Sequence, residues 1–477
     1  MTQLRAIAIT AEEIALDETL VTDFKSRLQG QLLCPGDPGY DEARQVWNGM
    51  IDKRPALIAR CIGTADIIDA INFARTHRLL VAVRGGGHNV AGNAVCDGGL
   101  VIDLSLMRGV HVDPKARTAR VQGGATWGDV DRETQVFALA TPGGQVSTTG
   151  VAGFTLGGGM GNMRRKYGLS IDNLLSVDIV TADGQILTAS PTENPDLFWG
   201  VRGGGGNFGV VTSFEFRLHP VGPMVMLGAP MYPEEQAGEI LRSWREFMAA
   251  APDELSSMAA IWAVPPAPHL PPEIHGKPVV LLAGVYAGPV EEGERVVQPL
   301  RELGTPLADL SGPMPYTVLQ RAFDPFFPKG ELLYYVKSLN LDHFSDEAIE
   351  VLLSHAAQRP SPLTLVLIWH QGGAISRVGA EETAFGRRDA PFMLSIDSAW
   401  TDPRDTEKNI SWSRALWSAM RPFSTGGLYL NFPGLGEEKE VLVRAAYGPN
   451  YDRLVALKNK YDPTNLFRMN QNIAPTV

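Results

Sequence analysis

Three glycine-rich segments in the first 210 residues constrain the fold more than any other feature of this chain. They are residues 85–87, 150–161 and 203–206, in a chain that contains 50 glycines. Glycine disfavours the interiors of helices and strands, but it allows positive φ angles and close approach of the backbone to a ligand. We therefore expect loops that lie along an extended ligand.

The first of these segments ends an apolar, strand-like run at residues 79–83, and His88 follows it directly. Successive exposed N–H groups in such a turn can bind an anion such as a pyrophosphate. His88 would then project from backbone that is pressed against the ligand. The alternative is a tight turn between strands with a merely exposed histidine, and these residues alone are compatible with both.

Composition limits the possible function classes. A length of 477 residues, 44% of them hydrophobic, is enough for two or three domains with large cores. A net charge of −11 without a long basic run argues against nucleic acid binding. The first 20 residues hold no long apolar run, which argues against a membrane span or secretory signal. The three cysteines lack metal-site spacing and cannot all pair, so we expect a reducing, cytoplasmic setting.

Short helices and strands alternate up to about residue 220. Thr64 starts an amphipathic pattern typical of a helix, and a second helix is expected over residues 126–139. Asp183-Gly184 supplies the turn of a hairpin over residues 178–190. This alternation of short elements predicts an α+β fold.

Beyond residue 220, glycine becomes less frequent and the expected strands become longer. They cover residues 279–286, 332–341, 364–370 and 392–400. Helical segments separate them, which predicts an antiparallel sheet with helices on one face. Aromatic and amide residues continue almost to the end of the chain, so we expect a docked tail with a further strand at residues 429–431.

Several common site classes do not fit the motifs. The glycines at 157–161 are not followed by a helix and a spaced acid, as a dinucleotide fingerprint requires. The chain has no P-loop, no His-Glu-x-x-His or paired-cysteine zinc motif, and no Gly-x-Ser-x-Gly element of a serine hydrolase. The ligand of the glycine-rich loops must therefore be bound in another way.

The motifs together resemble those of the berberine bridge enzyme-like flavoproteins. This family belongs to the vanillyl-alcohol oxidase superfamily, also called the PCMH-type FAD-binding proteins. Residues 84–89 resemble the loop of the family to which FAD is linked, and the match runs from about residue 40 to the terminus. Further matching segments are residues 157–169, 172–173, 198–209 and 462–473.

The resemblance implies an α+β fold with a PCMH-type FAD-binding domain of two subdomains and a substrate domain with an antiparallel sheet covered by helices. On this basis we divide the chain into four parts. They are an N-terminal helical segment that packs on the FAD domain (1–50), the FAD-binding domain (51–221), the substrate-binding domain (222–425) and a C-terminal berberine-bridge-like segment that returns to the FAD domain (426–477).

The resemblance also implies FAD that is bound covalently, through its 8α-methyl group, to His88. An uncharged backbone turn suits the diphosphate, and nearby groups must stabilise the negative charge of the reduced flavin. The expected cofactor-binding residues are Arg84, Gly85, Gly86, Gly87, His88, Asn89, Val146, Ser147, Thr149, Gly150, Val151, Gly153, Thr155, Gly161, Val210, Val211, Asn470 and Asn472.

The chain departs from the family pattern at one position. Many members add a second flavin bond through a cysteine in a Gly-x-Cys-x-Thr loop, and here Val146 stands at that position. No cysteinyl bond is therefore expected, and we interpret Cys96 as a small buried residue. Thr149 resembles the site that gates oxygen in the family, where valine goes with oxidase behaviour and leucine with dehydrogenase behaviour. Threonine is close to valine in shape, which favours an oxidase.

The candidate catalytic residues lie on expected strands of the second part of the chain. Alternation puts His370 on one face of its strand and Asp397 on one face of the next. The tail adds Tyr429, which matches an active-site tyrosine of the family, and Asn431. Several plant members carry a glutamate base near the position of Met393, and this chain does not.

Each candidate also has a purely structural interpretation. A strand tyrosine is usually a packing residue with a satisfied hydroxyl. His370 precedes Gln371-Gly372-Gly373, where a structural role is as reasonable as a catalytic one. Asp397 could be a buried, hydrogen-bonded acid.

The function implied is that of an FAD-dependent oxidase. A hydride would pass from an alcohol or amine carbon of a small organic molecule to FAD, and O2 would return the flavin to its oxidised form with release of peroxide. Two alternatives stay open: a flavin dehydrogenase that uses another electron acceptor, and a flavin-carrying binding protein without turnover.

Overall fold

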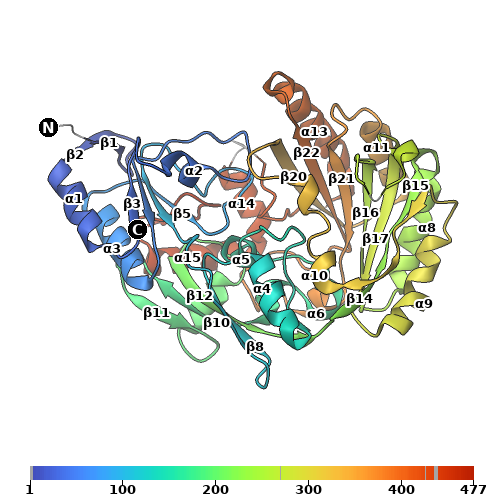
Figure 1. The fold of residues 1–477 in the computed structure, drawn as a ribbon, viewed down its shortest axis with the longest axis horizontal. Coiled ribbons are helices and arrows are strands. Elements are labelled where there is room, and N and C mark those ends of the chain that lie inside the picture. Colours follow the sequence, from blue (N-terminus) through green and yellow to red (C-terminus); the bar gives the residue numbers. More distant parts are fainter. Residues whose placement is uncertain (1–3, 269, 425, 435–438) are drawn as a thin grey trace.

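The computed structural model describes residues 4–268, 270–424, 426–434 and 439–477 (Figure 1). Two lobes lie side by side. The first, in blue to green, contains residues 4–220, and the red segment 439–477 returns to it. The second, in light green to orange, contains residues 224–424. The expected return of the tail is confirmed, and the boundaries of the four parts stay a prediction.

A four-stranded sheet forms the outer half of the first lobe. Its order is β3 (Gln31–Leu33), β4 (Leu57–Arg60), β6 (Leu100–Asp103) and β5 (Val81–Arg84). The last two pairs are parallel, and α3 (Thr64–Thr76) connects β4 to β5. The helix predicted from Thr64 is confirmed. Its apolar face packs on the sheet through Ile67 and Ile71, which are fully buried.

The N-terminal residues add smaller elements to this half. They are the hairpin β1 (Leu4–Ile7) and β2 (Glu13–Leu16), α1 (Glu18–Arg27) and α2 (Tyr40–Arg44). Phe24 of α1 stacks on Phe73 of α3, with ring centroids 4.2 Å apart. The helical segment therefore packs on the four-stranded sheet through α3.

A five-stranded antiparallel sheet forms the inner half. Its order is β11 (Ile186–Ala189), β10 (Leu174–Val180), β12 (Val210–Arg217), β8 (Thr118–Gln122) and β7 (Val110–Asp113). The hairpin predicted around Asp183-Gly184 is confirmed, with Val180 paired to Ile186. The helices beside it are α4 (Trp127–Thr134), α5 (Val151–Leu156), α6 (Arg164–Tyr167) and α7 (Pro195–Val201).

One expectation for this lobe was wrong in part. The segment 150–161 was expected to be loop throughout, but Val151–Leu156 forms the helix α5. Val151 is fully buried and Leu156 nearly so, in the core of the five-stranded sheet. This burial outweighs the low helix propensity of the segment, because tertiary packing supplies most helix stability in proteins.

The second lobe is built on a nine-stranded antiparallel sheet. Its main order is β18 (Ala308–Asp309), β15 (Pro230–Pro233), β17 (Pro278–Tyr286), β16 (Leu255–Ala263), β21 (Leu365–His370), β22 (Phe392–Trp400) and β20 (Leu333–Leu341). The strands β14 (Met224–Gly228) and β19 (Gly312–Pro315) join at one side. All four strand ranges predicted for this part are confirmed to within one residue.

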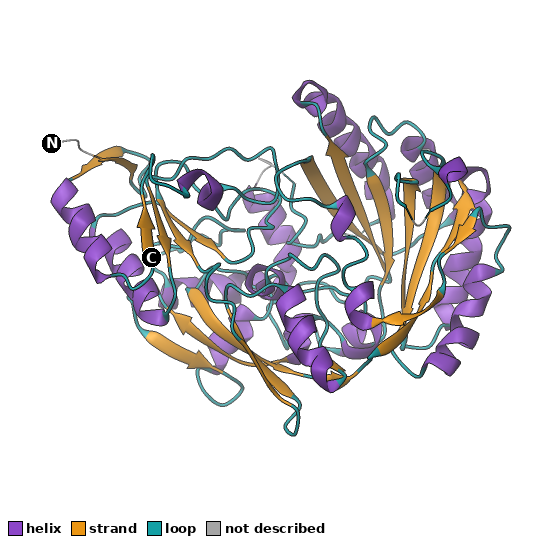
Figure 2. Ribbon diagram, viewed as in Figure 1, coloured by secondary structure: helices purple, strands orange, loops and turns teal. Residues whose placement is uncertain are grey.

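Helices cover the outer face of this sheet (Figure 2). They are α8 (Ala237–Ala250), α9 (Val290–Arg301), α11 (Asp346–Ala356) and α13 (Thr406–Met420). Val366 and Ile368 of β21 belong to the core under these helices. Leu365 and Leu367 point the other way, toward the first lobe. The predicted α+β architecture, with an antiparallel sheet covered by helices on one face, is confirmed.

The C-terminal segment is fixed by a buried lysine. Lys458, in α15 (Tyr451–Tyr461), donates hydrogen bonds to Asp462 at 2.7 Å and to the carbonyl oxygens of Asn207 and Phe467 at 2.9 and 3.0 Å. The strand expected at residues 429–431 was wrong. These residues are irregular, with only an isolated bridge between Lys337 and Pro433 nearby, and proline has no N–H to continue a ladder.

None of the helices in the described ranges is long and apolar enough to cross a membrane. The same ranges contain no group of three or more His, Cys, Asp or Glu side chains that could hold a metal ion.

Candidate active site

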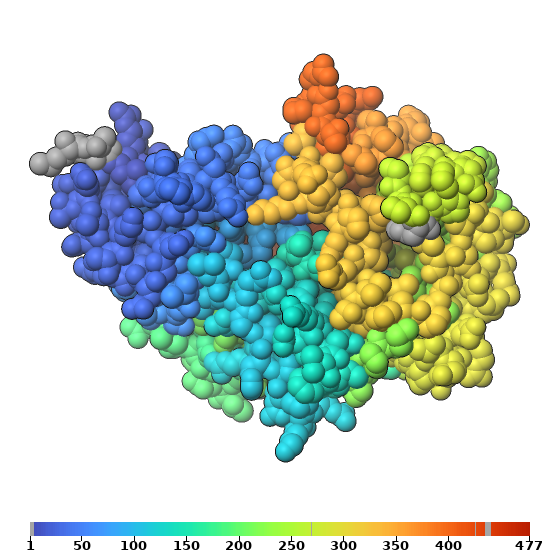
Figure 3. Space-filling model, in the orientation of Figure 1, coloured from blue at the N-terminus to red at the C-terminus, as the bar shows by residue number. Residues whose placement is uncertain are grey.

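One cavity of about 350 Å³ lies between the glycine-rich loops and the inner face of the nine-stranded sheet. All three glycine segments contribute to its lining, and residues 469–471 of the tail line it as well. The chain before β20, in amber, covers the junction between the lobes (Figure 3). The three predicted loops therefore do line one cavity.

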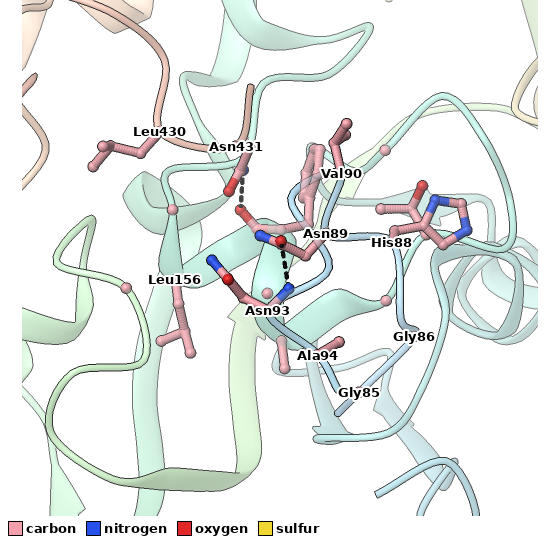
Figure 4. Close-up of a pocket in the computed structure, with 18 of the residues that line it drawn as sticks. Gly85, Gly86, His88, Asn89, Val90, Asn93, Ala94, Leu156, Leu430 and Asn431 are labelled. Atoms are coloured by element: carbon pink, nitrogen blue, oxygen red, sulfur yellow. Dashed lines mark hydrogen bonds between the residues drawn. The ribbon is translucent and has the colours of Figure 1, made fainter. Parts of the chain in front are cut away.

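The loop that carries His88 is packed so closely that glycine is required. A Cβ on Gly86 would lie 2.4 Å from the amide nitrogen of Gly150, and a Cβ on Gly150 would lie 2.3 Å from that of Gly86. Gly87 has φ +72°, which L side chains rarely adopt. His88 follows on the cavity side (Figure 4). The first and second glycine segments are thus in direct backbone contact.

The imidazole of His88 makes a hydrogen bond through one ring nitrogen and stacks on an aromatic ring. Nε2 lies 2.8 Å from the hydroxyl of Thr148, and the ring stacks on Trp47 with centroids 5.3 Å apart. Burial lowers the pKa of His88 to about 3, and the charge of Lys329 adds to the shift. The imidazole is therefore neutral at physiological pH, as a nitrogen nucleophile must be.

Most of the expected cofactor-binding residues meet at the cavity. Those that line it are Gly85, Gly86, Gly87, His88, Asn89, Val146, Thr149, Gly150, Gly153, Val210, Val211 and Asn470. The expected residues outside the lining are Arg84, Ser147, Val151, Thr155, Gly161 and Asn472.

Four of the six residues outside the lining have other contacts, whereas the side-chain oxygens of Thr155 and Asn472 are buried with no hydrogen-bond partner in the described structure. Arg84 turns away, and its Nε lies 3.3 Å from Asp103. Ser147 donates hydrogen bonds to Asp324 from its amide and its hydroxyl, at 2.7 and 2.6 Å. Val151 is part of the core, and a Cβ on Gly161 would lie 2.1 Å from the carbonyl oxygen of Gly143. These four residues shape the loops and are not part of the cavity lining.

The lining fits FAD. The cradle for a diphosphate is glycine backbone, with positive φ at Gly87, Gly203 and Gly205, and no Lys or Arg among the described residues lines the cavity. Asn470 lines the cavity, and its side-chain oxygen is buried with no hydrogen-bond partner in the described structure, so it can bind a ligand. Cys34, Cys61 and Cys96 are free, and all three lie outside the lining.

The sheet side of the cavity is mostly apolar. Met258 of β16, Leu365 and Leu367 of β21 and Val336 of β20 face it. Asp397 of β22 lies among them, and within the described ranges no other Asp, Glu, Lys or Arg lines the cavity. Burial raises its pKa to about 6, although the hydroxyl of Ser395 donates a hydrogen bond to it. This carboxylate can therefore accept a proton near neutral pH.

Tyr429 lies beside the cavity rather than in its lining. Its hydroxyl oxygen accepts hydrogen bonds from the amides of Gly159 and Met160, at 3.2 and 3.1 Å, and from the side chain of Asn431 at 2.8 Å. Burial raises its pKa, with the three donors acting in the opposite direction. Asn431 does line the cavity, and its amide also donates to the carbonyl oxygen of Phe154 at 3.1 Å (Figure 4).

The face expected for His370 was wrong. Its ring packs edge-on against Trp244 of α8 and Phe392, and Arg165 lies 2.8 Å from its Nδ1. Burial, with Arg165 and Arg164 nearby, lowers its pKa to about 3. The alternation along β21 was predicted correctly, but Leu365, Leu367 and Trp369 form its cavity face. Sequence alternation alone does not say which face of a strand meets the helices.

Several lining residues were not predicted. Trp47 precedes every recognised motif, yet it stacks on Tyr334 of β20 with centroids 3.9 Å apart. The side chain of Asn48 holds this contact, because it donates to Tyr334 O at 3.0 Å and accepts from Tyr334 N at 3.0 Å. The hydroxyl of Tyr334 is buried, with no partner in the described structure. The sequence gives no periodic signal for a contact between residues 47 and 334, because they come from irregular backbone and an edge strand.

Comparison with known proteins supports this reading of the cavity. Residues 55–190 match the model of an FAD binding domain, and residues 428–474 match the model described as berberine and berberine like. The chain is 31% identical to an FAD-linked oxidoreductase of Dictyostelium discoideum, over 96% of this chain and 97% of that protein.

Two further similarities concern nicotine oxidases. The chain is 32% identical to (R)-6-hydroxynicotine oxidase of Paenarthrobacter nicotinovorans, over 94% of this chain and 97% of that protein. The crystal structure of 6-hydroxy-D-nicotine oxidase from Arthrobacter nicotinovorans superposes with a TM-score of 0.83 at 30% identity, over 94% of this chain and 98% of that chain.

Proposed function

Because the chain belongs to the berberine bridge enzyme-like family of FAD-linked oxidoreductases, we propose that it oxidises an alcohol or amine carbon of a small organic molecule. FAD supplies the hydride acceptor when bound, and O2 is its reoxidant, giving hydrogen peroxide. The observation that carries the proposal is Asp397, a half-buried acid and the one Asp or Glu among the described residues of the cavity lining, on the apolar wall that faces the glycine-rich loops.

His88 is the proposed attachment point, through one covalent bond to FAD. It lines the cavity with a neutral imidazole, which has a free lone pair on one ring nitrogen. Val146 also lines the cavity, at the position where other family members carry a second linking cysteine, and valine cannot form that bond. The backbone of residues 85–87 and the side chain of Asn470, which also line the cavity, would hold the cofactor.

Asp397 is the proposed base. Its carboxylate takes the hydroxyl or amine proton of the substrate as the hydride leaves the neighbouring carbon. With a pKa of about 6, it is ionised above that pH, so activity should rise as the pH increases through about 6. The hydroxyl oxygen of Tyr429 accepts hydrogen bonds from three N–H groups. We therefore assign Tyr429 the role of positioning residues 159–160 and Asn431, and not that of the base.

The wall around Asp397 favours an apolar substrate with one polar group. Leu365, Leu367 and Met258 offer no hydrogen bonds, and a sugar needs a partner for each of several hydroxyl groups. A cationic amine is paired by the single carboxylate. The similarity to (R)-6-hydroxynicotine oxidase, whose name describes a heterocyclic amine as substrate, supports an amine.

The experiment is an anaerobic screen of amines, alcohols and oligosaccharides, read as bleaching of the flavin absorbance band. Bleaching by an apolar amine or alcohol supports the proposal, and bleaching by oligosaccharides alone contradicts the substrate class. A protein bleached by no compound would instead be a flavin-carrying binding protein.

Thr149 lines the cavity and is the proposed oxygen-gating position. Its small side chain leaves space that a leucine would fill, which supports oxidase behaviour. Mixing the reduced protein with O2 in a stopped-flow instrument tests this point, and sluggish reoxidation would favour a dehydrogenase with another acceptor. The variant Thr149→Leu should slow reoxidation while flavin reduction stays unchanged.

A further inference from the structure

Four polar side chains form a chain of hydrogen bonds at the junction between the lobes. Asp131 belongs to α4, Asn162 lies just before α6, and Gln320 follows α10 (Tyr316–Leu319), which lies between the lobes (Figure 1). These three side chains are buried and lie outside the cavity lining. The fourth, Gln145, is half-buried and lines the cavity.

The hydrogen bonds among these side chains close a ring through the backbone of residues 144–145. Nε2 of Gln320 donates to the carbonyl oxygen of Gly144 at 3.1 Å and to Oδ2 of Asp131 at 3.2 Å. Oε1 of Gln320 accepts from Nδ2 of Asn162 at 2.9 Å. Oδ1 of Asn162 accepts from Nε2 of Gln145. Gly144 directly precedes Gln145, so the hydrogen bonds start and end in the same loop.

The backbone carbonyl of Gly144 determines the direction of every side-chain amide in this ring. Such an amide has an NH2 donor on one side and an oxygen acceptor on the other, and its partners decide which is which. A carbonyl can only accept, so Gln320 directs its NH2 group to Gly144 and its oxygen to Asn162. Asn162 then directs its oxygen to Gln145, which must supply its own NH2 group. The side-chain oxygen of Gln145 is left for another partner.

Asp131 supports this direction in either protonation state. Burial raises its pKa to about 8, so the acid is neutral at physiological pH, although the hydrogen bond from Gln320 acts in the opposite direction. A neutral carboxyl group retains an oxygen that accepts, as an ionised one does. The NH2 group of Gln320 thus has two acceptors, and a reversed amide would place its oxygen against the carbonyl of Gly144.

The backbone of the loop is held as well. Ser147 donates to Asp324 from its amide and its hydroxyl, at 2.7 and 2.6 Å. Gln320 and Asp324 belong to the same segment of the second lobe, so this segment fixes both ends of residues 144–147. Within the described ranges, no hydrogen bond reaches Oε1 of Gln145, and this residue lines the cavity. The oxygen is therefore a fixed acceptor that a ligand in the cavity can use.

We propose that Gln145 is a specificity-determining residue, whose side-chain oxygen accepts a hydrogen bond from an N–H or O–H group of the substrate. Its three buried partners are positioning residues, because they act through Gln145 and do not line the cavity. This inference rests on the proposed function, since it takes the cavity as the substrate site. The substrate then carries two polar groups. One gives its proton to Asp397 on the sheet wall, and the other is a donor that meets Gln145 on the loop wall.

A fixed acceptor discriminates between a hydroxyl group and its methyl ether. The ether has no hydrogen to donate, and it would meet an oxygen that the ring prevents from turning away. A site built to bind a hydroxyl or N–H group rejects an analogue that lacks it much more strongly than an apolar pocket rejects a missing methylene. A glutamine that turned freely would lose this selectivity, because it could present its NH2 group to the ether oxygen. The selectivity therefore reports the direction of the amide.

The probes are pairs of phenylalkylamines and benzyl alcohols, in which one member carries a hydroxyl group on the ring and the other carries its methyl ether. The apparent Kd of each probe comes from the concentration dependence of flavin reduction under anaerobic conditions. In the wild type, we expect the hydroxylated member of a reactive pair to bind about tenfold more tightly. A wild-type protein that shows no such preference in any pair would overturn the inference.

Two substitutions remove parts of the ring. Gln145→Met keeps the length of the side chain and removes the acceptor, whereas Gln320→Met keeps Gln145 but removes the group that fixes its direction. In both variants we expect the preference to fall from about tenfold to about twofold or less. Asp131→Asn keeps an acceptor for Gln320 and should retain the preference.

Gln135→Met is the matched control. Gln135 is also half-buried, and its NH2 group donates to the backbone carbonyls of Leu139 at 2.8 Å and Val221 at 2.9 Å, but it lies outside the cavity lining. The variant should retain the preference even where its melting temperature falls. A lost preference in Gln135→Met would mean that any missing hydrogen bond of this kind has the same effect, and the assignment to Gln145 would be wrong.

The remaining outcomes distinguish failure of this inference from failure of the proposed function. A retained preference in Gln145→Met would overturn the inference, and a changed flavin content or absorbance in that case would assign the oxygen to FAD instead of the substrate. A retained preference in Gln320→Met would overturn the positioning role of the ring. A wild-type protein that is bleached by no compound of the anaerobic screen would instead reject the proposed function.

Discussion

The cavity wall formed by the glycine-rich loops consists largely of backbone, whereas the opposite wall consists of side chains from one sheet face. On the first wall, residues 85–87 and 203–206 leave no room for a Cβ at several positions, such as Gly86 and Gly203. On the second wall, the described lining consists of Leu, Met, Val, Trp and Tyr side chains and one acid, Asp397. A cofactor shared by a whole family suits a fixed backbone cradle, while substrate choice is left to side chains that can change without altering the fold.

The largest effect expected is on the backbone wall. Gly86→Ala would put a Cβ 2.4 Å from the amide nitrogen of Gly150. The clash is with backbone atoms, which cannot move aside as the end of a flexible side chain could. We expect a folded protein that purifies nearly free of flavin, measured as the ratio of flavin to protein absorbance. Gly63→Ala is the control, because a Cβ there meets nothing within 4 Å. A yellow Gly86→Ala protein with normal flavin content would show that the two loops are not a fixed cradle.

The next effect belongs to the side-chain wall. Asp397→Asn removes the proposed base without changing the shape of the wall, so we expect flavin reduction about 100-fold slower at unchanged flavin content. Rapid-mixing reduction under anaerobic conditions measures this rate. If the variant is reduced as fast as the wild type, the base is another group.

The pH profile sharpens this assignment. Burial raises the folded pKa of Asp397 to about 6, so the carboxylate is protonated below that pH and ionised above it. The rate of reduction should therefore increase through about pH 6 and level off. The hydrogen bond from Ser395 lowers this pKa, so Ser395→Ala should move the rise to higher pH. A rise at the same pH in Ser395→Ala would mean that a different group titrates.

The contrast between the walls also explains what sequence could predict. The glycine loops, the hairpin at Asp183-Gly184 and the strands of the large sheet follow from local patterns, since glycine spacing and alternation are properties of neighbouring residues. Trp47, Tyr334 and Thr148 act through contacts between distant segments, and no local pattern marks them. His370 shows the intermediate case, in which alternation is readable but the choice of face depends on tertiary packing.

Tyr429 contacts the glycine-rich wall and also Asn431, so a change at this residue tests how the cavity lining is supported. Its hydroxyl accepts from Gly159 and Met160 of the second glycine segment, and from Asn431. Tyr429→Phe leaves three buried donors unsatisfied, at a cost of about 1–3 kcal/mol each before relaxation. We expect a lower melting temperature together with flavin reduction about tenfold slower, because the loop and Asn431 lose their support. Slower reduction at unchanged melting temperature would favour a direct chemical role for the hydroxyl.

The smallest effect on catalysis is expected for His370, which follows the cavity-lining Trp369 in β21 and points to the opposite face of the sheet. Trp369 lines the cavity, and His370 faces α8 with its ring against Trp244 and its Nδ1 near Arg165. His370→Asn should therefore leave the rate of flavin reduction within about twofold, while it lowers the melting temperature through the lost packing and hydrogen bond. Trp369→Phe is the matched variant on the other face, and it should change the relative rates for different substrates. The two residues are adjacent in β21 but face opposite sides of the sheet, so the pair compares the two faces directly. A large loss of reduction rate in His370→Asn at normal stability would mean that the helix-covered face takes part in the chemistry. The assignment of substrate chemistry to the cavity face alone would then be wrong.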